Sequence, residues 1–297
     1  MTTRRHFIIG AGAIAGFGLP GTGLFARAEP GLADSLRREF TRIERESEGR
    51  LGVAMLDTQS HEQAGHHAED RFPMCSTFKM LAAAAVLARV DAGKESLDRR
   101  ITFKATDVVV NSPITKDHTG GDGMTLGAIC EAAMTYSDNT AGNLILATLG
   151  SPQALTAYAR SIGDAVTRLD RNEPTLNEAV PGDVRDTTTP LAMLKNMQTL
   201  LLGDVLSPAS KGQLTKWVAG NKTGDTRLRA GLPAGWKVGD KTGAGERGST
   251  NDIGIVWPPN RAPVLIAVYL TETSAPADKR NAAIAAVGRA VATAISG

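Results

Sequence analysis

The stretch MCSTFKMLAAAAVL, residues 74–87, places a serine and a lysine three positions apart at the start of an alanine- and leucine-rich run. This composition predicts a helix over residues 77–90, and Gly93 supplies a stop signal just beyond it. Residues at i and i+3 lie on the same helical face, so the Ser76 hydroxyl and the Lys79 amine are expected to be neighbours. An amine there can exchange a proton with the hydroxyl, which is how a serine nucleophile is activated.

The segments on either side of this run predict the rest of the fold. An apolar stripe predicts an amphipathic helix over residues 32–47, and RLGVAMLDT after Gly49 predicts a strand. Alanine-rich segments between polar loops predict helices as far as about residue 218. From residue 236, three apolar runs separated by short polar turns predict an antiparallel meander, followed by a helix over residues 278–295.

Strands at both ends of the chain, with helices between them, predict an α+β fold with two lobes. One lobe is an antiparallel sheet flanked by the N- and C-terminal helices, built from residues of about 29–66 and 219–297. The other lobe is all-helical and takes residues of about 67–218. A site in the groove between the two lobes is therefore expected.

The first 28 residues have the pattern of a removable export signal. Arg4 and Arg5 precede a short, glycine-rich apolar stretch that ends in Ala26-Arg27-Ala28, an A-x-A cleavage pattern. The paired arginines resemble a twin-arginine signal, and the alternative is an ordinary secretory signal. Both readings export the protein to the periplasm or beyond, with residues 29–297 as the mature domain and no membrane attachment after cleavage.

The charge balance argues against nucleic-acid binding. The signal contains three of the 33 Lys and Arg residues and no acidic residue, so 30 basic residues remain against 31 acidic ones, a net charge of −1. Tracking a phosphate backbone requires a basic face, which this composition does not favour.

Two short motifs downstream complete a set with the serine and lysine. They are Ser137-Asp138-Asn139, between two helical segments, and Lys241-Thr242-Gly243, on the first strand of the meander. Each motif alone is common: an isolated S-x-x-K is more often a helix cap and a surface lysine. The three motifs in this order are the set found in class A β-lactamases and penicillin-binding proteins.

From about residue 32 to its end, the chain resembles a class A serine β-lactamase. A fourth motif, RNEPTLNEAVPGDVRD (residues 171–186), contains Glu173 and Asn177, which match the pair that holds the hydrolytic water in that family. This pair separates the hydrolases from their peptidase relatives. Glu173-Pro174 resembles the family's cis-proline bond, and Arg171 and Asp186 match the ion pair that closes its omega loop.

The resemblance implies a role for each matching residue. Ser76 would be acylated with Lys79 or Glu173 as the base, a choice that stays open, and Glu173 would activate the water for deacylation. Ser137 would pass a proton to the departing lactam nitrogen, and the N–H groups of Ser76 and Ala244 would form the oxyanion hole. The implied substrate-binding residues are Asn139, Asn177, Lys241, Thr242, Gly243, Ala244 and Arg227.

Two positions depart from the family pattern. Thr250 stands where many members place an arginine that binds the substrate carboxylate, but Arg227 matches the position from which other members supply that charge. Asn111 stands where an aromatic residue usually lines the pocket, so the substrate would be less enclosed on that side.

The resemblance also bears on the two cysteines. The family pairs a cysteine aligned with Cys130 with a residue that is Ala83 here, or one aligned with Cys75 with a residue that is Gly245 here. Each cysteine lacks its partner, so both are expected to be free thiols. A Cys75–Cys130 disulfide is not expected, because each would have to leave a packed helix.

His61, His66 and His67 fit no zinc-ligand spacing and are expected in a solvated turn between two strands, so neither a catalytic metal nor a cofactor is predicted. The expected partners are β-lactam molecules, and the expected state is a monomer. The alternative functions are a penicillin-binding DD-peptidase and a β-lactam sensor that stays acylated, and an intact Glu173 argues against both.

Overall fold

The computed structural model describes residues 31–296 of the 297-residue chain, so the predicted export signal lies outside the described residues. The α-helices are α1 (Leu32–Ser47), α2 (Phe78–Asp91), α3 (Leu126–Thr135), α4 (Asn139–Leu149), α5 (Pro152–Ser161), α6 (Pro190–Met197), α7 (Pro208–Ala219), α8 (Leu228–Gly231) and α9 (Ala277–Ser296). The strands are β1 (Arg50–Asp57), β2 (Gln63–His66), β3 (Phe72–Pro73), β4 (Arg100–Ile101), β5 (Met124–Thr125), β6 (Thr187–Thr188), β7 (Lys237–Ala244), β8 (Thr250–Trp257) and β9 (Val264–Thr271).

A five-stranded sheet in the order β2-β1-β9-β8-β7 forms the centre of one lobe. All its neighbouring strands are antiparallel, with Val53 opposite Val268 and Lys241 opposite Ile253. The predicted meander over β7, β8 and β9 is confirmed. The N-terminal hairpin joins it through β1, so both ends of the chain build this lobe, as the sequence predicts.

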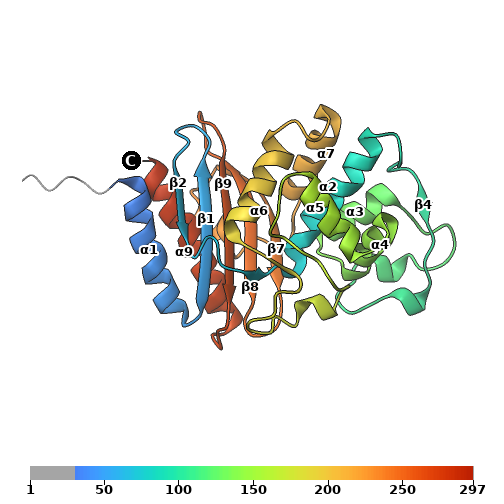
Figure 1. Cartoon of the computed structure of the whole chain (residues 1–297), viewed down its shortest axis with the longest axis horizontal. Coiled ribbons are helices and arrows are strands. Elements are labelled where there is room, and N and C mark those ends of the chain that lie inside the picture. Colours follow the sequence, from blue (N-terminus) through green and yellow to red (C-terminus); the bar gives the residue numbers. More distant parts are fainter. Residues whose placement is uncertain (1–30, 297) are drawn as a thin grey trace, which may run out of the picture.

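Helices α1 and α9 lie side by side over one face of the sheet (Figure 1). Leu36, Phe40 and Ile43 recur at helical spacing on α1, and all three are buried against the sheet and α9. Burial of this stripe is the main force that holds α1 in place, because an isolated helix of this length is marginal in water.

The helical lobe lies on the other side of the sheet, with α6 between the sheet and the remaining helices (Figure 1). Helix α2 runs through its interior, and every residue from Phe78 to Leu87 is buried. A helix that is apolar on all sides must be surrounded by protein. It begins one residue later than predicted, directly after the 3₁₀ turn η1 (Cys75–Thr77), which packs against β7 and β8.

This arrangement brings the start of α2 next to strand β7 at the edge of the sheet, where the two lobes meet. Within residues 31–296, no helix combines the length and the apolar character needed to span a bilayer.

Candidate active site

Ser76 lies in η1, immediately before the N-terminus of α2. Cys75, the preceding residue, has a left-handed backbone conformation with φ of 45°, a sparsely populated region for a side chain other than glycine. The Ser76 hydroxyl is 2.9 Å from Lys79 Nζ and 3.3 Å from Glu173 Oε1. The predicted pairing of Ser76 with Lys79 across one helical turn is thus present in the structure.

Lys79 is fully buried and is surrounded by acceptors. Its Nζ donates to Ser76 Oγ, to the carbonyl of Ser137 at 2.8 Å and to Asn139 Oδ1 at 2.8 Å, and it lies 3.0 Å from Glu173 Oε1. Burial lowers the pKa of Lys79 below its ordinary value, although the Glu173 carboxylate opposes this shift. The amine is therefore easier to deprotonate than an exposed lysine.

Glu173 is buried, with its carboxylate directed at the serine and lysine. Asn177 Nδ2 donates to Glu173 Oε2 at 2.5 Å, and the Glu173-Pro174 peptide is cis, as the sequence predicts. Asn143 on α4 holds the backbone: its Oδ1 accepts from Glu173 N at 2.8 Å, and its Nδ2 donates to the Glu173 carbonyl at 2.9 Å. Sequence reasoning missed Asn143, although it lies four residues after Asn139 on the same helical face.

The loop that carries Glu173 is closed by the predicted ion pair. Arg171 Nε lies 2.6 Å from Asp186 Oδ2, and the Asp186 side chain is 1% exposed. Asp186 Oδ1 also accepts from the N–H groups of Asp170 and Arg171, at 2.7 and 3.0 Å. One buried carboxylate therefore joins both ends of the loop.

The Ser137-Asp138-Asn139 motif begins α4. Asp138 caps the helix by accepting from Ala141 N at 2.9 Å, and it also binds the backbone and hydroxyl of Thr115. These bonds fix the positions of its two neighbours, so that Ser137 Oγ accepts from Lys241 Nζ at 2.9 Å and Asn139 Oδ1 accepts from Lys79. Asp138 thus stabilises the start of α4, and the side chains of Ser137 and Asn139 face the site.

Lys241 and Thr242 come from β7, the edge strand of the sheet. Lys241 is fully buried, and burial together with the nearby Lys79 ammonium places its pKa well below the ordinary value. Thr242 Oγ1 lies 2.5 Å from Thr223 Oγ1. Thr223 is a second residue that sequence reasoning missed, because it reaches the strand from a distant turn.

Arg227 faces the same part of the site. Its Nη1 donates to the carbonyls of Gly243 and Asn251, at 2.8 and 2.7 Å, and its Nε donates to Asn281 at 3.0 Å. The structure therefore places Arg227 beside β7, next to the position that Thr250 leaves without a guanidinium.

These side chains surround a cleft of about 490 Å³ between the lobes. Asn111 lies on its rim with φ of 59° and is exposed. The lining includes Ser76, Ser137, Asn139, Asn177, Arg227, Thr242, Gly243 and Ala244, with Thr223 and Asn111. Lys79, Glu173 and Lys241 lie directly behind this lining. The structure thus brings every sequence-predicted site residue to one place.

Both cysteines are buried free thiols, and burial raises the pKa of each above its ordinary value. The histidine prediction is partly wrong. His61 lies in the turn between β1 and β2, but His66 is the last residue of β2, and its side chain is only 11% exposed. The alternating inside and outside positions of an edge strand, not a solvated loop, determine its environment.

Comparison of the sequence with protein families matches residues 35–295 to the β-lactamase enzyme family. The chain is 49% identical over 258 residues to "Beta-lactamase OXY-2" of Klebsiella oxytoca, covering 87% of this chain and 89% of that protein. It is 47% identical over 259 residues to "Beta-lactamase Toho-1" of Escherichia coli, with the same coverage.

Solved structures give the same family. An ancestral class A β-lactamase superposes with a TM-score of 0.86 at 62% identity, over 87% of this chain and 99% of the other. A putative class A β-lactamase, PenP from Rhodopseudomonas palustris, superposes with a TM-score of 0.86 at 57% identity, over 88% of this chain and 100% of the other.

Proposed function

The chain belongs to the class A β-lactamases, which makes it an enzyme that hydrolyses β-lactam antibiotics and gives resistance to them, and we propose that it does so through an acyl-enzyme on Ser76. The observation that carries this proposal is the triangle formed by Ser76 Oγ, Lys79 Nζ and Glu173 Oε1, with separations of 2.9, 3.0 and 3.3 Å. A hydroxyl, an amine and a carboxylate at these distances can exchange a proton.

In acylation, Ser76 Oγ bonds to the lactam carbonyl carbon, and the amide C–N bond breaks. The serine proton can reach Glu173 directly or through Lys79, because Glu173 Oε1 lies near both groups. Whichever group takes this proton must pass it on to replace the one that Ser137 gives to the lactam nitrogen, so that Glu173 is an ionised carboxylate again before deacylation. The lactam nitrogen takes a proton from Ser137, whose hydroxyl accepts a hydrogen bond from Lys241 and can therefore direct its own proton toward the cleft.

In deacylation, a water attacks the ester carbon and gives its proton to the Glu173 carboxylate. The bond between the ester carbon and Ser76 Oγ then breaks, and Oγ takes this proton from Glu173, directly or through Lys79. Asn177 Nδ2 holds one oxygen of Glu173, and Asn177 Oδ1 is buried without a partner among residues 31–296. An amide oxygen in that state can accept from the water or from the substrate amide. Glu173 and Asn177 together distinguish this function from that of a DD-peptidase.

Hydrogen-bond donors are already in place for the negative charge that develops on the lactam carbonyl oxygen and for the substrate carboxylate. The N–H of Ser76, at the positive end of α2, and the N–H of Ala244, at the end of β7, are the expected oxyanion donors. Lys241, Thr242 and Arg227 lie together on the β7 side and would bind a substrate carboxylate. Arg227 uses Nη1 for the two backbone carbonyls and Nε for the Asn281 side chain, which leaves Nη2 as the nitrogen expected to meet the substrate.

The test is turnover of a chromogenic cephalosporin by the purified mature protein, with intact-mass spectrometry of the protein during the reaction. Sustained turnover with a transient adduct that maps to Ser76 is expected. A single stoichiometric burst would instead indicate a β-lactam-binding peptidase or sensor, and an adduct on another residue would overturn the assignment of Ser76.

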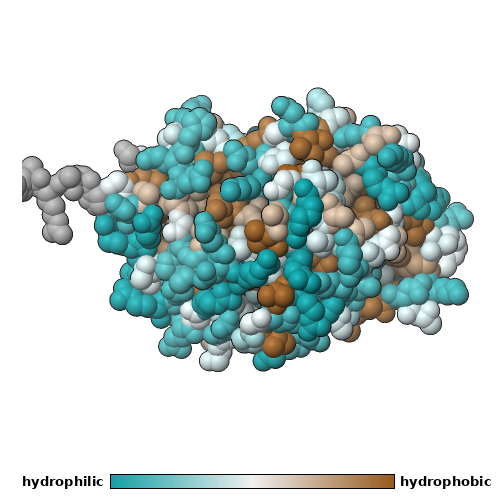
Figure 2. Space-filling model, in the orientation of Figure 1, coloured by the Kyte–Doolittle hydropathy of each residue, from teal (hydrophilic) through white to brown (hydrophobic). Residues whose placement is uncertain are grey.

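We also propose that the mature enzyme is an exported monomer delivered by the twin-arginine route. Arg4-Arg5 and the cleavage pattern at residues 26–28 support the route. Apolar residues on the face shown in Figure 2 are scattered among hydrophilic ones, which supports the monomer. Replacing both arginines by lysine should leave the protein in the cytoplasm, and light scattering should give the mass of one chain.

A further inference from the structure

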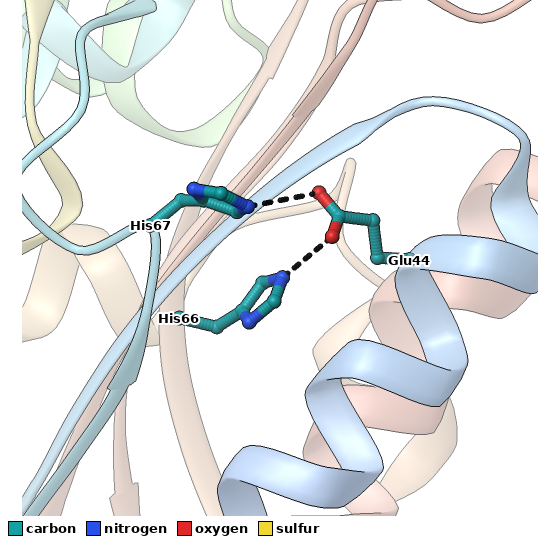
Figure 3. A group of neighbouring side chains, drawn as sticks. All are labelled: Glu44, His66 and His67. Atoms are coloured by element: carbon teal, nitrogen blue, oxygen red, sulfur yellow. Dashed lines mark hydrogen bonds and ion pairs between the residues drawn. The ribbon is translucent and has the colours of Figure 1, made fainter.

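Away from the active site, three potential metal ligands converge at the opposite edge of the sheet. They are Glu44 in the last turn of α1, His66 at the end of β2, and His67 directly after it. One ligand atom from each lies within 4.8 Å of the other two. Figure 3 shows both imidazole rings turned toward the Glu44 carboxylate.

We propose that Glu44, His66 and His67 form a binding site for a divalent transition-metal ion such as Zn²⁺, distinct from the catalytic cleft. Two imidazoles and one carboxylate are a known ligand set for zinc, and they leave a coordination position for water or another ligand. Imidazole nitrogens favour Zn²⁺, Ni²⁺ and Cu²⁺ over Mg²⁺ or Ca²⁺, which prefer sites built from oxygen alone.

The distances fit such an ion after small side-chain rotations. His66 Nε2 lies 2.7 Å from Glu44 Oε2, and His67 Nε2 lies 3.5 Å from Glu44 Oε1. Two ligands of one tetrahedral zinc are roughly 3.3 Å apart, given metal–ligand bonds of about 2.0 to 2.1 Å. The His67 pair already has about this separation, and the His66 pair must widen by about 0.6 Å when the metal replaces the proton between the two atoms.

Hydrogen bonds beyond the three ligands orient two of them. His67 Nδ1 lies 3.0 Å from Asp70 Oδ2, and a carboxylate can only accept, so Nδ1 carries a proton. In the neutral ring, Nε2 then presents its lone pair to the Glu44 carboxylate. Two facing acceptors require a proton or a cation between them, and a histidine held by a second carboxylate is the usual arrangement around a protein-bound zinc.

The carboxylate is also held in place. Leu51 N donates to Glu44 Oε1 at 3.0 Å, which ties the helix side chain to the start of β1. The carboxylate is therefore held in a position from which its two oxygens face His66 and His67.

The site is accessible and separate from the cleft. The His67 side chain is 43% exposed, so an ion can enter from solvent. Strands β2 and β7 form opposite edges of the five-stranded sheet. Four strand spacings of about 4.8 Å put them roughly 19 Å apart. A bound ion would join α1 to the β2 edge and would stabilise the folded chain without contacting the reacting atoms.

The experiment uses tag-free mature enzyme, treated with EDTA, desalted and titrated with Co²⁺, whose visible absorption bands report a four-coordinate site. One Co²⁺ per chain is expected, displaced by Zn²⁺ and not by Mg²⁺. At a Zn²⁺ concentration of 100 times Kd, the unfolding equilibrium constant should fall about hundredfold, which corresponds to a rise in Tm of about 5 °C.

Variants separate this site from non-specific binding. His67→Ala and Glu44→Gln should each weaken binding at least a hundredfold, and Asp70→Ala, which removes only the group that orients His67, should weaken it about tenfold. His61→Ala and His118→Ala, which alter exposed histidines outside the cluster, are the matched controls and should bind as the wild type does.

All variants should hydrolyse β-lactams at the wild-type rate, which also shows that they fold. This readout is independent of metal binding, so failure of the metal site and failure of the active-site assignment are distinguishable. Absence of the Co²⁺ bands in the wild type would overturn the proposal. So would equal binding by His67→Ala and wild type, or loss of binding in His118→Ala.

Discussion

Replacing Asp186 by asparagine is expected to loosen the loop that carries Glu173 while leaving the rest of the fold intact. The asparagine keeps the shape of the side chain, and its Oδ1 can still accept from the two N–H groups of Asp170 and Arg171. The second oxygen becomes an NH₂ group that faces Arg171 Nε, now 2.6 Å from Oδ2. Two donors then oppose each other at a side chain that is 1% exposed.

The magnitude follows from the single bond that is lost. A hydrogen bond between charged groups contributes about 1.5 to 3 kcal/mol, whereas breaking a fully buried ion pair costs about 3 to 5 kcal/mol. The range of about 1.5 to 3 kcal/mol applies here, because the Arg171 side chain is 17% exposed and keeps Glu178, 2.5 Å away, as a second partner. Since 1.4 kcal/mol is tenfold, the open form of the loop should become about ten- to a hundredfold more populated.

Thermolysin digestion under native conditions, followed by mass spectrometry, measures this population, because cleavage tracks the open form when reclosing is fast. Cleavage within residues 171–186 should accelerate by the same factor. The matched control is Asp183→Asn in the same loop, where the partner Arg185 is 49% exposed and such a pair contributes at most about 1 kcal/mol. Unchanged cleavage in Asp186→Asn, or equal acceleration in both variants, would refute the conclusion that Asp186 holds this loop closed.

Further substitutions test the other parts of the site. Glu173→Ala should accumulate a stable penicilloyl adduct in intact-mass spectra, because the water loses its base, and Ser76→Ala should form no adduct; wild-type turnover by Glu173→Ala would show that another residue activates the water. Asn143→Ala unpairs two backbone groups of Glu173 at about 1 to 3 kcal/mol each, so deacylation should slow and Tm should fall; a change in Tm alone would make Asn143 purely structural. Arg227→Ala should lower kcat/KM ten- to hundredfold, mostly through KM, and the exposed Arg38→Ala should not; equal effects would remove Arg227 from the site.

Much of this site could be predicted from the sequence because its geometry is local. Ser76 and Lys79 are joined by one helical turn, so their contact follows from their spacing. The lobes follow from hydrophobic patterning, since α1 buries one regular apolar stripe and the strands β8 and β9 are apolar runs buried along almost their whole length. Such patterns depend on residues only a few positions apart, so they can be recognised in the sequence.

Contacts between distant segments could not be predicted in this way. Arg229 follows Arg227 closely, and the sequence predicts a surface side chain that a substitution would hardly affect. The structure instead pairs its Nη2 with Asp240 Oδ1 at 2.5 Å, and Asp240 is fully buried. Arg229→Ala would leave that carboxylate without its charged partner, so it is unsuitable as a neutral control for Arg227.

The cluster of Glu44, His66 and His67 also depends on contacts that the sequence does not predict. The sequence predicts a solvated turn for His66 and His67, and on a regular strand their successive side chains would point to opposite faces. The structure ends β2 at His66 and gives His67 a left-handed backbone with φ of 44°, which turns its ring back toward the same carboxylate. That carboxylate, Glu44, lies 22 residues earlier, on a helix placed by apolar packing. A non-glycine residue in this conformation is costly in isolation, and here the His67 ring contacts Asp70 and Glu44 while its carbonyl accepts from Asp70 N at 3.2 Å. The proposed metal site therefore depends on one backbone angle and one packed helix, neither of which a spacing rule contains.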